Sequence, residues 1–127
     1  TEEVCNWSFV VPSDMAAGNW LAEIIWISSY TTAGHTVVWG AMISATTEGD
    51  ADSLIEQAGA TQDTASEDVN TTEANRMIST TLTISNLDSV AAGDIVTLRF
   101  SRVAANASDD ATGDARLVAV RLKIPRS

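Results

Sequence analysis

Three aspartates and a glycine are close together in "SDDATGD", residues 108–114, and carboxylates at short spacing can act as catalysts or bind metal ions. A hydrolase that works with two carboxylates holds them roughly 5–10 Å apart across a cleft, usually on different elements. Neighbours within one loop do not reach that arrangement. The spacing therefore does not predict a catalytic carboxylate pair.

A calcium site is the alternative reading of the same segment, because Ca²⁺ is bound by carboxylate and carbonyl oxygens from clustered loop residues. The residues it would use are Asp109, Asp110 and Asp114, but they lack the D-x-D-x-D-G spacing with a distal glutamate. The favoured interpretation is a turn, in which aspartate accepts hydrogen bonds from nearby amides and glycine adopts positive φ. An ion pair from Arg102 to Asp109 or Asp110 would hold it.

No other grouping predicts an enzyme or a cofactor. His35 is the only histidine and Cys5 the only cysteine, so a zinc site lacks ligands and no disulfide forms within the chain. No serine lies in a nucleophile motif such as G-x-S-x-G. Free cysteine is usually buried, and we expect Cys5 to be a structural core residue.

The chain is acidic, with 17 Asp and Glu against 7 Lys and Arg and a net charge of −10. Such a charge repels nucleic acid and anionic membrane surfaces. The basic residues are concentrated after residue 98. Those proposed to pair with an acidic neighbour at an interface are Arg116, Arg121, Lys123 and Arg126.

Alternation of apolar and polar residues is the dominant pattern, and it predicts strands. The predicted strands cover residues 5–11, 20–28, 36–45, 76–85, 95–102 and 116–124. A long polar segment, 46–75, separates the third from the fourth, and only "DSLIEQA" (52–58) within it suits a short helix. The pattern predicts a single all-β domain over residues 1–127, an antiparallel β-sandwich.

The four tryptophans, Trp7, Trp20, Trp26 and Trp39, all fall in predicted strands, which favours packing in the core or between subunits. Trp20 follows the turn at Gly18 and Asn19 and is the tryptophan whose exposure is to be tested. Together with Tyr30 it is the candidate for contact with a glycan.

Several segments carry a resemblance to a known family: "WSFVVPSD", "TVVWGAM" and "LDSVAAGDIVTLRFSRVAANASDDATGDARLVAVRLKI". Together they resemble a jelly-roll domain found in structural proteins of tailed phages. That resemblance implies a non-enzymatic virion protein at the capsid surface. The expected role is capsid decoration or cement, with a homotrimer bound to the major capsid protein and segment 46–75 as a contact arm. The alternative it leaves open is a receptor- or glycan-binding module of a head or tail fibre.

Overall fold

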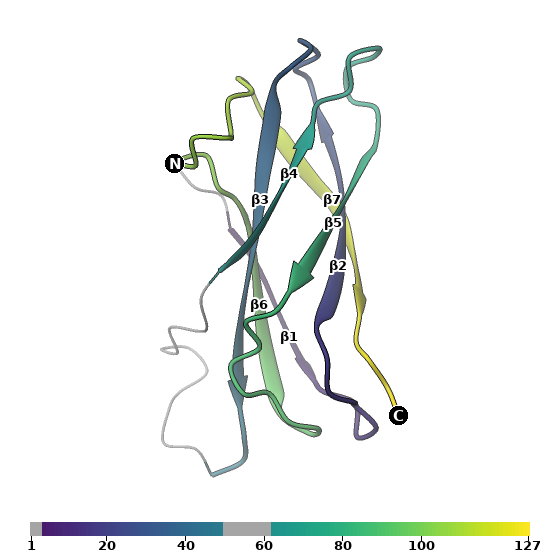
Figure 1. Ribbon diagram of the computed structural model, residues 1–127, viewed down its shortest axis with the longest axis vertical. Helices are drawn as coiled ribbons and strands as arrows, with labels where there is room; N and C mark the ends of the chain where they lie inside the picture. Colours follow the sequence, from purple (N-terminus) through teal and green to yellow (C-terminus); the bar gives the residue numbers. More distant parts are fainter. Residues whose placement is uncertain (1–3, 50–61) are drawn as a thin grey trace.

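Two antiparallel sheets form a β-sandwich in the computed structural model, which describes residues 4–49 and 62–127 (Figure 1). The strands are β1 (Val4–Val10), β2 (Trp20–Ser28), β3 (Thr36–Thr46), β4 (Asp63–Asp68), β5 (Ile78–Ile84), β6 (Ile95–Arg102) and β7 (Ala115–Lys123). One sheet has the order β1-β6-β3-β4 and the other the order β5-β2-β7. The predicted all-β sandwich is confirmed, and the described residues include no helix.

The core lies between the sheets, and the alternating pattern places its side chains there. In β2 the alternate residues Trp20, Ala22, Ile24 and Trp26 are fully buried, while the residues between them are exposed or half-buried. The facing sheet contributes apolar side chains from β3 and β6. Side chains of a strand point alternately to its two faces, so period two in the sequence becomes one buried face in the fold.

The structure adds a strand to the six that the sequence predicts. β4 lies inside the polar segment 46–75 and pairs with β3, from Thr36 opposite Asp68 to Ala41 opposite Asp63. Its sequence, "DTASED", has no apolar alternation, and its residues are half-buried or exposed. This strand forms because it pairs with β3, a strongly apolar neighbour. The strand propensity of its own residues does not explain it. The possible helix at 52–58 lies outside the described residues.

A glycine in the middle of β3 permits a close approach between segments. A Cβ atom at Gly40 would overlap the side-chain amide of Gln62 and would lie 2.8 Å from Cγ2 of Val103. Gly40 is therefore needed because two loops pack against β3 at this point. A close approach of another segment is a common reason for a glycine within a strand.

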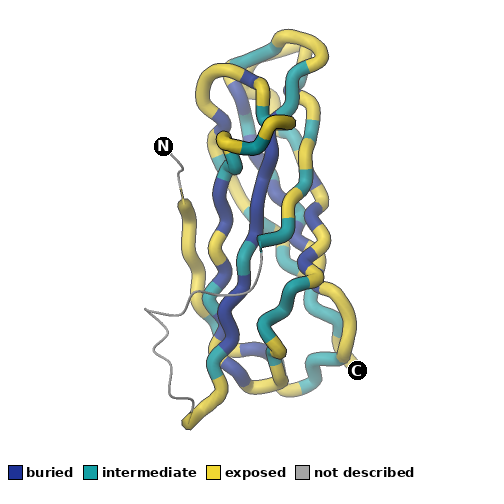
Figure 2. Tube along the Cα trace, turned by 60° about the vertical axis from the view of Figure 1, so that its left-hand side comes forward, coloured by how far each residue is buried: buried dark blue, intermediate teal, exposed yellow. Residues whose placement is uncertain are grey.

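The two lateral sides of the sandwich differ. On one side β4 and β5, from different sheets, contact each other, whereas β1 and β7 on the other side make no comparable contact. Figure 2 shows β1 as a nearly continuous exposed segment, and only Phe9 within it is half-buried. The sandwich is thus closed at β4 and β5 and open between β1 and β7.

None of the described residues belongs to a helix of the length and hydropathy needed to cross a membrane.

Candidate functional site

The loop from Val103 to Asp114 is held by one arginine. Arg102 ends β6, and its guanidinium donates from Nε to both carboxylate oxygens of Asp109, at 3.2 and 3.0 Å, and from Nη2 to Oδ1 at 2.7 Å. It also donates to the carbonyl oxygens of Ala111 and Gly113, at 2.6 and 2.7 Å. The Asp109 carboxylate is 1% exposed and accepts a further hydrogen bond from the amide of Val38. This bidentate pair fastens the loop to β3.

Of the two carboxylates predicted as partners of Arg102, only Asp109 makes the contact. Asp110 instead accepts a hydrogen bond from the amide of Thr36, and its carboxylate lies 3.6 Å from Nδ1 of His35. Asp114 lies apart, at one end of a cavity described below. Within residues 4–49 and 62–127 no three His, Cys, Asp or Glu side chains are close enough to hold a metal ion. The calcium alternative would need Asp109, Asp110 and Asp114 together, and in the described part of the chain these three form no such group.

Two further carboxylates, not singled out from the sequence, hold other loops. Asp63 accepts four hydrogen bonds from the amides and side chains of Ser85 and Asn86, the turn that follows β5. Asp94, 3% exposed, accepts from the amide of Ala91 and from the hydroxyl of Thr47. Each stabilises a turn by satisfying donors that would otherwise lack partners. The sequence offers a signal only for Asp94, an aspartate that follows a glycine just before an apolar strand.

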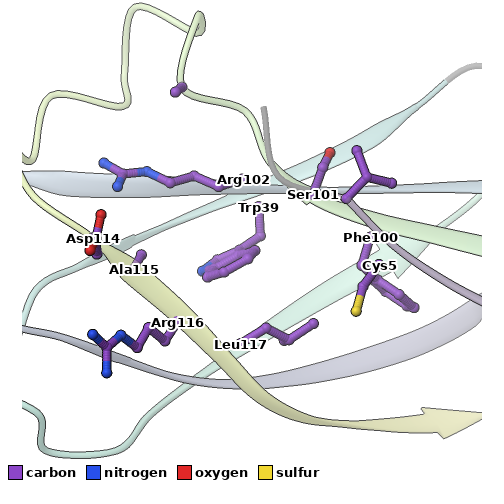
Figure 3. Close-up of a pocket in the computed structure, with 11 residues that line it drawn as sticks. Cys5, Trp39, Phe100, Ser101, Arg102, Asp114, Ala115, Arg116 and Leu117 are labelled. Carbon is purple, nitrogen blue, oxygen red and sulfur yellow. The ribbon is translucent and has the colours of Figure 1, made fainter. Parts of the chain in front are cut away.

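A cavity of about 380 Å³ lies at the open side of the sandwich. It is lined by residues from β1, β3, β6 and β7, among them Cys5, Trp39, Phe100, Asp114, Arg116 and Leu117. Figure 3 shows that the charged side chains gather at one end, whereas Cys5, Phe100 and Leu117 are at the other. The cavity is therefore amphipathic, and its volume lies in the range of ligand sites, roughly 300–1,000 Å³.

The Trp39 indole lies between the two ends of the cavity, with its nitrogen toward the charged end (Figure 3). Trp39 is 3% exposed, and its Nε1–H has no hydrogen-bond partner among the described residues. Trp26, which packs against it at 5.8 Å between ring centroids, donates its Nε1–H to the Thr80 hydroxyl at 2.9 Å. A buried donor without a partner lowers the stability of a fold by about 1–3 kcal/mol. Trp39 therefore offers an unused hydrogen-bond donor beside the cavity. Trp20 Nε1 also lacks a hydrogen-bond partner in the described part of the chain, but Trp20 is not among the cavity residues.

Two predictions about individual side chains are wrong, the buried position of Cys5 and the glycan contact of Trp20. Trp20 is fully buried and packs against Phe9, because its face of β2 is the inner face, so it cannot contact a glycan. Tyr30, the other glycan candidate, is half-buried and packs edge-on against His35. Trp7 is 43% exposed and Cys5 is exposed, although both lie on the inner face of their sheet, opposite Leu98 and Phe100. They are exposed because the three-stranded sheet does not extend over β1.

The four cations proposed for an interface fall into two groups. Arg121 pairs with Glu23 at 3.0 Å, and Arg126 pairs with Asp14 at 2.7 Å, so both are engaged within the chain. The hydrogen bond from Arg126, with its positive charge, holds the pKa of Asp14 below its usual value. Arg116 and Lys123 make no ion pair or hydrogen bond with the described residues. These two remain candidates for a partner.

Searches of protein-family models, curated proteins and solved structures found no match to this chain.

Proposed function

We propose that this chain is a non-enzymatic structural protein of a phage-like particle, a decoration or cement protein that binds capsid subunits at the outer surface and stabilises the shell. The proposal combines the sequence resemblance with one structural observation. An apolar strand edge, β1, is left uncovered on one side of an otherwise closed sandwich, with Val4, Trp7 and Val10 exposed by 38%, 43% and 64%. Exposed apolar surface of this kind is typical of a contact with another protein.

The strand connectivity supports a jelly-roll topology. β1 pairs with β6, β2 with β5 and β3 with β4, and these nested pairs alternate between the two sheets. A hairpin ribbon folded over twice produces this order, and a jelly roll is an antiparallel ribbon wrapped into two sheets. β7 adds a further strand beside β2.

A mechanical role is supported by the way the loops are held. Three loops or turns are each held by one carboxylate, that of Asp63, Asp94 or Asp109, which accepts several hydrogen bonds. A domain that strengthens a shell benefits from loops that hold their shape, because contacts made by ordered loops cost less entropy on binding. We further propose a homotrimer bound to the major capsid protein, with Arg116 and Lys123 facing acidic residues.

The experiment is a binding assay with particles. The purified chain is mixed with shells of the particle that encodes it, lacking their own copy, and the shells are separated by sedimentation. The proposal predicts a fixed ratio of chain to capsid subunit and a higher melting temperature of the decorated shell. A monomer with no affinity for shells contradicts it, and specific binding on a glycan array together with that result would favour the fibre module instead.

A further inference from the structure

The opening between β1 and β7 has the features of a docking site for an extended segment of polypeptide. We infer that an acidic segment of a partner protein adds to the free edge of β1 and inserts an apolar side chain into the cavity beside Trp39. The inference deepens the proposed function and rests on it for the identity of the partner, a capsid subunit. The chemistry of the segment is argued from the site alone.

β1 is the one edge among the described strands that lacks protection. Edge strands usually carry charged residues or proline, or are covered, because their unpaired amides and carbonyls invite another strand. β4 carries three carboxylates, β7 carries three cations and β5 is covered by its contact with β4. β1 reads "VCNWSFV" and contains no acidic residue, no basic residue and no proline. A partner strand can therefore pair with β1 without desolvating a charge.

The cavity continues this edge inward and specifies an anchor. Its apolar end, formed by Cys5, Phe100 and Leu117, suits a large apolar side chain, which becomes buried between the sheets. Toward its other end the Trp39 N–H has no acceptor among the described residues, and an uncharged oxygen at the tip of the inserted side chain supplies one without bringing a charge into an apolar site. A strand added to β1 directs alternate side chains toward this inner face, so one side chain can enter the cavity and reach the indole.

Charge favours an acidic segment. β1 and β7 contain three cations and no carboxylate, and of these cations only Arg121 has an ion pair, with Glu23, among the described residues; β4 on the closed side contains three carboxylates and no cation. Arg116 is exposed at the mouth of the cavity without an ion pair to the described residues, and Asp114 is the one carboxylate in its lining. On a chain of net charge −10 this side is the place where an acidic segment meets least repulsion. A carboxylate flanking the apolar anchor would pair with Arg116, the cation in the cavity lining that has no ion pair among the described residues.

The test starts with peptide selection against the isolated chain. The probe is a randomised library of short peptides displayed on yeast, from which the strongest binder is synthesised. We expect enriched peptides to carry a large apolar residue flanked by Asp or Glu in an alternating pattern. The affinity of that peptide should fall at least tenfold with Trp7→Lys, which places a charge on the β1 surface, and with Trp39→Phe, which keeps a ring and removes the N–H.

Two surface variants control for folding. Thr81→Lys makes a matched change on the exposed face of β5 and should leave the affinity unchanged. Arg116→Glu should weaken the acidic peptide and strengthen a version with Lys in place of its acidic residues. Peptides that bind Trp7→Lys and Trp39→Phe as tightly as the parent chain would overturn the inference, as would a selection that enriches no peptide.

The same variants separate this inference from the proposed function. If the parent chain binds shells and Trp7→Lys binds them equally well, the docking site is wrong and the decoration role stands. If the parent chain binds no shells while the selected peptide still depends on Trp7 and Trp39, the site stands and the decoration role is wrong. If sedimentation shows that the chain self-associates and Trp7→Lys abolishes this, the occupant is a second copy and the inference is overturned.

Discussion

The pair formed by Arg102 and Asp109 should be the most costly single interaction to break in the loop that follows β6. In the variant Arg102→Met the aliphatic stem is kept and the guanidinium is lost. The carboxylate of Asp109, 1% exposed, then keeps only the hydrogen bond from the amide of Val38. Two carbonyls, those of Ala111 and Gly113, also lose their donors.

The size of the effect follows from the burial of the pair. The exposed fractions of the two side chains are 16% and 1%, so the surviving charge cannot be solvated without opening the loop. Removing one partner of a buried ion pair costs about 3–5 kcal/mol. For a domain of this size that corresponds to a fall in melting temperature on the order of 10–20 °C. The surface pair of Arg121 with Glu23, by contrast, is expected to contribute at most about 1 kcal/mol.

Urea unfolding followed by circular dichroism measures both changes. Arg102→Met should lower the free energy of unfolding by about 3 kcal/mol or more, and Arg121→Met, the matched control on β7, by about 1 kcal/mol or less. Equal losses in the two variants would show that the ion pair of Arg102 with Asp109 contributes no more than a surface pair, and the reasoning from burial would be wrong.

Three other measurements test separate parts of the structure. Asp63→Ala leaves the turn after β5 without an acceptor for its amides, and the free energy of unfolding should fall by about 1–3 kcal/mol in a denaturant titration. Trp26→Phe breaks a buried hydrogen bond, whereas Trp39→Phe removes an unpaired donor. The Trp26→Phe variant should therefore be less stable than the Trp39→Phe variant by about 2 kcal/mol. Equal stabilities of the two variants would mean that the N–H of Trp39 has a partner. Because Arg126 lowers the pKa of Asp14 in the folded chain, this pair stabilises the fold above the ordinary aspartate pKa, and the contribution is lost as the pH falls through the lowered pKa. Carboxyl NMR should show Asp14 titrating below the usual aspartate value, and Arg126→Gln should return it to that value.

The fold class was predictable because apolar residues alternate along most strands. The inner faces of β2, β3 and β6 follow directly from that alternation. β4 could not be found in this way, since a polar edge strand is specified by pairing with its neighbour and not by its own side chains. The same limit applies to β1, where alternation correctly places Trp7 on the inner face but says nothing about whether a second sheet covers it.

The site was predictable only where the partners lie near one another along the chain. Arg102 and Asp109 are seven residues apart and flank one loop, so the sequence suggests their contact. The cavity joins the starts of β1 and β7 with the middle of β3, and no local pattern indicates that these segments meet. The N–H of Trp39, which has no partner among the described residues, is likewise a property of the packing, because Trp26, the tryptophan packed against it, finds a partner in Thr80.

Unused hydrogen-bonding and apolar groups are unevenly distributed over the sandwich. Around the loops at its ends, buried carboxylates such as Asp94 and Asp109 are fully engaged, which favours a rigid frame. At the open side, Trp39 Nε1 lacks an acceptor, Arg116 lacks an ion pair among the described residues and Trp7 is half exposed. Apolar side chains are exposed elsewhere too, Met77 and Val118 among them, and Trp20 Nε1 is buried without a partner among the described residues. At the open side, however, these three features coincide beside one unprotected edge strand, which supports the inferred docking of another polypeptide, and that is why the variants at this edge discriminate best between the proposed roles.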